Sequence, residues 1–225
     1  MIRAMKLILS LSGLVLFTAC ASGPKLPDWQ LEAKGSMERS VTAYMEGNSR
    51  VEMAELERAR SQLSRTGRAE LLATAELLHC ATRVASLVFE PCAGFEKLRQ
   101  DATAAQQAYA DYLRGQVQPQ GVALLPEQQR ATASGNAGAV KGIADPLSQL
   151  VAAAVLFQKG QASPAAMQQA VDTASAQGWR RPLLAWLNVQ AQLAEKGGDP
   201  DAAARLRRRI ALTQGQAVNA VQEKH

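Results

Sequence analysis

Residues 183–212 read LLAWLNVQAQLAEKGGDPDAAARLRRRIAL, with apolar residues every three or four positions on both sides of a Gly-Gly-Asp-Pro sequence. They are Leu183, Leu187 and Ala191 before it and Ala203, Leu206 and Ile210 after it. This spacing predicts one buried face on each of two helices. Glycine permits the left-handed backbone that ends a helix, and proline is tolerated in the first turn of the next one. The stretch therefore predicts two helices joined by a tight turn.

The same spacing continues through most of the chain. Further core-facing stripes run over residues 29–44, 53–63, 71–81, 95–112, 147–157 and 167–174. Asp28 is expected to cap the first helix, and Ser163 with Pro164 is expected to start a later one. The stripe at 95–112 is the most regular and predicts one long helix. The sequence therefore predicts eight helices in four antiparallel pairs. This is an all-α fold of helical hairpins, stacked as a repeat array or as a compact bundle.

Three of the predicted turns share a pattern: an aromatic or small residue closes one helix, a glycine follows, and a polar residue leads into the next helix. They lie at residues 44–48, 157–161 and 194–200. A small residue follows the turn glycine by five places at Gly198 and Ala203, and again at Gly160 and Ala165. These turns resemble those of the tetratricopeptide repeat, although Glu52 replaces the small residue after the first turn. The resemblance implies stacked hairpins with a concave face that binds an extended peptide or another protein.

Composition predicts how the chain is divided. The expected segments are a signal peptide at 1–19, a tether at 20–27, an N-terminal helical half at 28–115, a linker or excursion at 116–145, a C-terminal helical half at 146–213 and a polar tail at 214–225. The excursion is rich in Pro and Gly and has a short helix predicted at 126–133. Long loops in compact proteins are often functional. A small-ligand or wall-binding role would predict a buried pocket near this excursion.

The first twenty residues predict the compartment. Arg3 and Lys6 precede an apolar run at 7–17, which is typical of a secretory signal peptide and too short for a bilayer span. Phe17-Thr18-Ala19-Cys20 resembles the lipobox of bacterial lipoproteins, although Leu is usual where Phe17 stands. The resemblance implies cleavage before Cys20, lipidation of that residue and a membrane anchor made by the lipid. With Ala21 rather than Asp next, it also implies the periplasmic face of the outer membrane.

The charge balance excludes one class of partner. The chain has 25 basic and 20 acidic residues, and removing residues 1–19 lowers the net charge from +5 to +3 because they carry Arg3 and Lys6 and no acid. So small an excess, together with a periplasmic location, predicts no nucleic-acid partner. A run of arginines follows the last turn, at Arg205, Arg207, Arg208 and Arg209. These residues are interpreted as a solvated helix face near a C-terminus, where cations are favoured.

Cys80 and Cys92 form an even pair in an oxidising compartment. On one continuous helix they would lie about 18 Å apart, whereas a disulfide needs Cα atoms within about 7 Å. Residues 87–91 end in a proline and could reverse the chain, so the pair forms either a disulfide or two buried free thiols. His79 lies beside Cys80, but no fourth ligand follows, and no metal or other cofactor is predicted.

The sequence lacks the parts of a familiar active site. Its only histidines are His79 and His225, so no triad with a distinct base is predicted. The carboxylates available as a catalytic pair are Glu52, Glu55, Glu57 and Glu90, and the first two lie one turn apart on a charged helix. The glycines at 135–142 lack the spacing of a phosphate-binding loop. No enzymatic activity and no catalytic residue are predicted.

One aromatic and basic cluster is a candidate partner-binding site. It contains Trp179, Arg180, Arg181 and Trp186, because Arg and Trp are favoured interface anchors. The alternative is ordinary packing between helices. The leading hypothesis is a non-catalytic lipoprotein scaffold that binds an envelope protein through its helical repeats. The alternative function is a small-ligand or peptidoglycan-binding lipoprotein.

Overall fold

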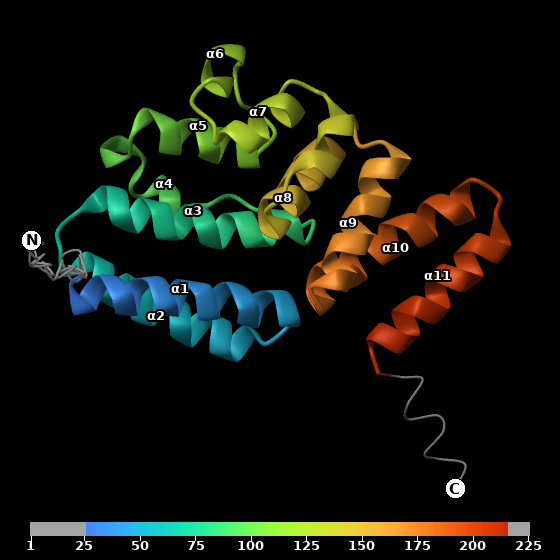
Figure 1. The fold of residues 1–225 in the computed structure, drawn as a ribbon, viewed down its shortest axis with the longest axis horizontal. Helices are drawn as coiled ribbons and strands as arrows, with labels where there is room; N and C mark the ends of the chain where they lie inside the picture. Colours follow the sequence, from blue (N-terminus) through green and yellow to red (C-terminus); the bar gives the residue numbers. More distant parts are fainter. Residues whose placement is uncertain (1–25, 216–225) are drawn as a thin grey trace, which may run out of the picture.

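The computed structural model describes residues 26–215, and every regular element in that range is a helix (Figure 1). The α-helices are α1 (Asp28–Glu46), α2 (Ser49–Ser64), α3 (Ala69–Ala85), α4 (Ala93–Glu96), α5 (Ala104–Leu113), α6 (Pro119–Val122), α7 (Glu127–Ala133), α8 (Pro146–Gln158), α9 (Pro164–Ala176), α10 (Arg180–Lys196) and α11 (Pro200–Thr213), with short 3₁₀ helices η1 (Arg99–Asp101) and η2 (Ala137–Gly142). The predicted all-α class is confirmed for this range. The predicted signal peptide and Cys20 lie outside it.

Among residues 26–215, no helix combines the length and the apolar content that a bilayer crossing needs.

Several helices begin at a residue whose side chain caps the helix N-terminus. Asn48, Ser163 and Asp199 each accept a hydrogen bond from the backbone N–H three residues later, at 3.2, 3.1 and 2.8 Å. These bonds satisfy donors that the helix itself cannot pair. One prediction is wrong in detail, because Pro27 occupies the N-cap of α1 and Asp28 is its first helical residue. At this position the negative carboxylate of Asp28 still interacts favourably with the positive end of the helix dipole.

The single helix predicted over 95–112 is wrong, because the structure divides this stretch into α4, η1 and α5. The new helix starts at Thr103, whose hydroxyl accepts a bond from the Gln106 N–H while the Gln106 side chain accepts one from the Thr103 N–H. Such a reciprocal capping box begins a helix. Phe95 and Tyr112 are buried as expected, whereas Ala105 is exposed because the break changes which face points inward.

The helices pack as hairpins around α3 (Figure 1). The α1–α2 hairpin lies against one side of α3, and α5 lies on the other side. Near one end of α3, α8 crosses it and leads through α9 to a second hairpin, α10–α11. This second hairpin lies at the opposite end of the long axis from the start of α1.

One large apolar cluster runs from the end of α1 and α3 through α8 and α9 to α10 and α11. A smaller separate cluster lies between α1, α2 and α3. Trp186 of α10 is fully buried in the large cluster, its ring edge-to-face with Phe157 at 5.8 Å between centroids. The indole Nε1–H of Trp186 donates to the Ala85 carbonyl at the end of α3, at 3.2 Å. The 116–145 segment also contributes, through the buried side chains of Leu125 and Val140. This segment therefore packs into the same core as the helices on either side of it.

A disulfide joins Cys80 in α3 to Cys92 just before α4, with Cα atoms 5.8 Å apart. The chain reverses directly after α3, because Leu87 adopts a left-handed backbone with φ of 60°. The N–H of Val88 then donates back to the Arg83 carbonyl at 3.0 Å. Closing a loop of this length stabilises the folded state by about 3 kcal/mol relative to the open chain.

Candidate functional site

An open apolar cavity of about 520 Å³ lies between α3, α5 and the segment that joins α6 to α7. Its walls include Leu77 and Leu78 of α3, Tyr109 of α5, and Leu124 and Pro126. None of its lining residues carries a charge at neutral pH, since Tyr109 is the only titratable one and a phenol is neutral there. A volume of this size is in the range of small-molecule and peptide side-chain sites.

A second apolar cavity of about 410 Å³ lies between α1 and α3. Trp29, Ala33 and Met37 line it from α1, together with Leu63 and Leu71. Unlike the first cavity, this one has charged side chains among its lining residues. They are Lys34, Glu38 and Arg68.

Thr74 and Leu78 of α3 line both cavities, which therefore lie on either side of one strip of that helix. We call the two cavities together the α3 trough. Its floor is this strip, and its walls are α1 on one side and α5 with the α6–α7 segment on the other. Gln106 of α5 fixes one wall, because its Nε2–H donates to Thr74 Oγ1 at 2.8 Å and to the Glu70 carbonyl at 2.7 Å.

A polar cavity of about 380 Å³ lies beside the disulfide, and His79, Arg83 and Glu90 are among the residues that line it. The Arg60 guanidinium binds the Glu76 carboxylate there with two bonds of 2.6 and 2.8 Å. Glu76 is only 4% exposed. Because both charges of this pair are engaged with each other, the pair joins α2 to α3 rather than presenting a free charge to the cavity.

Gly94 of α4 packs directly over this ion pair. A Cβ atom built on Gly94 would collide with the Glu76 carboxylate. The absence of a side chain at this position is therefore what lets α4 approach α3 beside the disulfide.

A second buried ion pair supports the same interface. Arg83 Nη2 donates to Glu52 Oε1 at 2.7 Å, and Glu52 is 1% exposed. His79 Nδ1 lies 3.3 Å from the same carboxylate oxygen. Burial and then the nearby Arg83 charge lower the pKa of His79 from 6.5 to about 4. The nearby Glu76 carboxylate opposes this lowering of the His79 pKa but does not cancel it.

The carboxylates considered as a catalytic pair point to different partners. Glu52 binds Arg83, whereas Glu55 accepts bonds from Arg39 at 3.0 Å and from Arg58 at 2.8 Å. The bond from Arg39 lowers the pKa of Glu55 below its ordinary value. Both groups thus hold helices together. Glu57 and Glu90 are exposed, and Glu90 lines the polar cavity beside the disulfide.

The four residues predicted to bind a partner do not form one exposed surface. Trp186 is buried, and Arg181 is used inside the chain: its Nε donates to the Tyr44 carbonyl at 2.7 Å and its Nη2 to Ser49 Oγ at 2.8 Å. Trp179 is half-buried, and Arg180 alone of the four is exposed. Both Trp186 and Arg181 pack between helices: Trp186 joins α10 to α3 and α8, and Arg181 joins α10 to α1.

Tyr44 is held between two guanidinium groups. Arg83 stacks on its ring at 4.4 Å from the centroid and Arg181 at 4.2 Å. Tyr44 is 1% exposed, so both cation–π contacts lie in a desolvated setting where such contacts are strongest.

Within residues 26–215 there is no group of three or more His, Cys, Asp or Glu side chains placed to hold a metal ion. Sequence reasoning missed the α3 trough, the Arg60–Glu76 pair and the role of Gly94. The only local signal for the trough was an apolar Leu124-Leu125 pair beside a proline in an otherwise polar segment.

Comparison of the chain with protein families, with curated proteins and with solved structures finds no match.

Gly94→Ala is expected to lower the free energy of unfolding by about 1–3 kcal/mol, because the added methyl forces α4 away from the Glu76 carboxylate. Urea denaturation measures this change. Gly142→Ala is the control, since no heavy atom lies within 4 Å of its built Cβ, and it is expected to change stability by less than about 1 kcal/mol. Equal effects of the two variants would contradict the close approach at Gly94.

Stability is expected to fall as the pH drops from 6.5 to 4. In this window the unfolded chain protonates His79 while the folded chain does not, so protons favour unfolding. Between pH 7 and pH 4.5 the loss from this one residue is about 2 kcal/mol. Urea denaturation at the two pH values measures it, and His79→Gln should reduce the pH dependence by that amount. An unchanged dependence in His79→Gln would exclude the buried neutral imidazole.

Proposed function

We propose that the protein is a non-catalytic lipoprotein scaffold that binds an amphipathic segment of an envelope protein in the α3 trough. A lipid on Cys20 would anchor it to the periplasmic face of the outer membrane. The anchor rests on the lipobox-like sequence Phe17-Thr18-Ala19-Cys20 behind a basic and apolar signal. The binding role rests on the trough.

The observation that carries the binding role is that the two cavities of the trough adjoin on α3. They measure about 520 and 410 Å³ and share the lining residues Thr74 and Leu78. Leu124 on the wall of the trough is 47% exposed. A contiguous apolar hollow with a polar margin is typical of a site that receives another protein segment.

The charges at the trough favour an amphipathic occupant. Lys34, Glu38 and Arg68 place both signs beside the α1 cavity, whereas the α5 cavity has no charged lining. A helix with one apolar stripe could fill the floor with its anchors and pair its flanking charges with this margin. A non-catalytic role agrees with the buried carboxylates, which bind arginines of neighbouring helices.

A second candidate function is supported by the cavity of about 520 Å³ alone. It lies beside the 116–145 segment, where a ligand-binding lipoprotein was expected to have its pocket, and Leu124 and Pro126 of that segment line it. Its uncharged walls favour a small apolar ligand over the polar sugars and peptides of peptidoglycan. Such a ligand would not need the α1 cavity.

Photo-crosslinking in intact cells tests the trough. A photoreactive residue at Ala105 and another at Gln30, which line the two cavities and are exposed, are expected to capture the same envelope protein. Leu124→Glu should lower the yield at both sites at least tenfold, because it places a carboxylate in an apolar contact.

Leu193→Glu is the matched control, since Leu193 is 45% exposed on α10 and lines neither cavity. It should leave the yield unchanged. Capture at Ala105 without capture at Gln30, or an equal loss in both Glu variants, would reject binding along the whole trough.

Cys20→Ala is expected to move the protein from the membrane pellet to the soluble fraction, because acylation of that thiol would supply the anchor. Fractionation followed by mass spectrometry of the N-terminal peptide measures both the location and the acylation. Cys80→Ala with Cys92→Ala is the control and should leave the protein in the pellet. A wild-type N-terminus without acyl groups would reject the anchor.

A further inference from the structure

The outer face of α11 is basic. Arg205, Arg208, Arg209 and Leu212 follow one another at steps of three, one and three residues, so they lie on one side of the helix. All four are exposed, and Leu212 is 62% exposed. Ala203 and Ile210, which are buried, lie on the opposite side.

Nothing else in the described chain covers this face. The packing of α11 is made against α10, the other helix of its hairpin. Arg207 points back to that helix, since its Nη2 lies 2.8 Å from Glu195 Oε1. By contrast, Arg205, Arg208 and Arg209 form no salt bridge within residues 26–215, so three guanidinium groups remain free to bind anions.

We propose that this face of α11 docks on an anionic phospholipid bilayer. Guanidinium groups bind phosphates with paired N–H donors, and a Leu side chain among them can enter the apolar interface below the headgroups. An acidic peptide would pair the arginines but would leave Leu212 exposed to water. The combination of three arginines with a protruding Leu therefore favours the bilayer.

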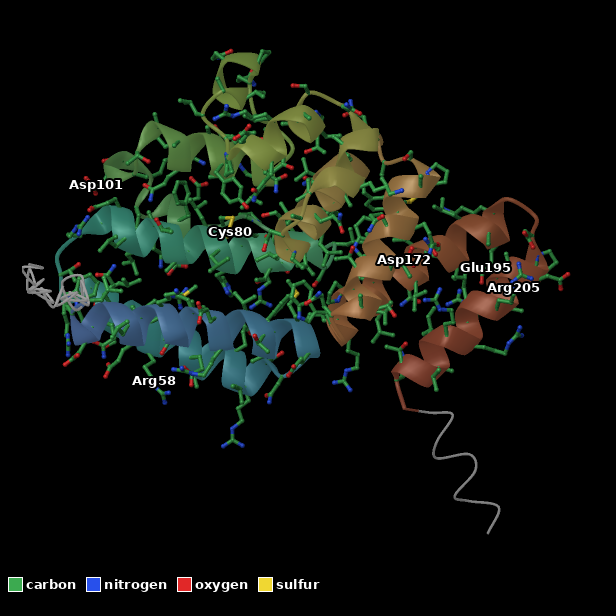
Figure 2. All side chains as sticks on the ribbon, in the orientation of Figure 1. Arg58, Cys80, Asp101, Asp172, Glu195 and Arg205 are labelled. Carbon is green, nitrogen blue, oxygen red and sulfur yellow. A yellow bond between two sulfur atoms is a disulfide. The ribbon has the colours of Figure 1, made fainter. Side chains whose placement is uncertain are left out.

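The position of α11 in the molecule indicates what a bilayer contact there would do. In Figure 1 the start of α1 and helix α11 lie at opposite ends of the long axis. In Figure 2, Arg58 on the α1–α2 hairpin and Arg205 on α11 are likewise far apart along that axis. A bilayer contact at α11 would hold the end of the molecule that is remote from the start of α1. The docking does not depend on the lipid on Cys20.

Vesicle co-sedimentation tests the proposal with the chain from Ala21 to His225, which keeps every contact described above and carries no lipid. It is expected to pellet with phosphatidylcholine vesicles that contain about one-third phosphatidylglycerol, and not with pure phosphatidylcholine vesicles. Each arginine near an anionic surface is expected to change the partition coefficient about fivefold. Arg205→Gln with Arg208→Gln and Arg209→Gln should therefore lower it about 100-fold, and high salt should lower it as well.

The matched control changes three other exposed basic residues that form no salt bridge within residues 26–215, as Arg50→Gln, Arg65→Gln and Lys97→Gln. It has the same net charge as the α11 variant and should bind like the parent chain. Circular dichroism of both variants checks that they fold. Equal losses in the two triple variants, no binding to anionic vesicles, or binding to isolated peptidoglycan alone would overturn the proposal.

Discussion

The Arg83 side chain makes the contacts on which the arrangement of the other helices depends. From α3 it binds Glu52 of α2 and stacks on Tyr44 of α1, and Arg181 of α10 stacks on the same ring. Four helices therefore meet at one buried charge cluster. The cluster costs desolvation, but each of its charged side chains has a partner, so it orients the two hairpins specifically rather than only adding burial.

The polar and apolar surfaces of α3 have different roles. One side carries Glu76, His79 and Arg83, which bind or lie against α2 and close that interface. Another side carries Thr74 and Leu78, where flanking helices stand apart and leave the trough open. Because charged contacts fix the α2 side, the open side can remain apolar without the hairpins collapsing onto it.

Local signals predicted most helices, because periodicity and caps are encoded within a few residues of each other. The break at Thr103 was encoded locally too, as a Thr and a Gln three residues apart, but the apolar spacing across it suggested one helix. The trough was not predictable, since Thr74 and Leu124 meet only in the folded chain. Trp186 and Arg181 were predicted to bind a partner but pack inside the chain. Residue types that suit interfaces between proteins also suit interfaces between helices.

Long-range pairing also sets an order of assembly. The bond from Arg181 to Tyr44 spans 137 residues and that from Trp186 to Ala85 spans 101. A chain that emerges N-terminus first can close α1 on α2 at once, but Tyr44 has no covering guanidinium from α10 until nearly the whole protein has emerged. The part of the core around Tyr44 is therefore synthesised early but completed late. Until α10 has emerged, part of the interior of the N-terminal half stays open to water.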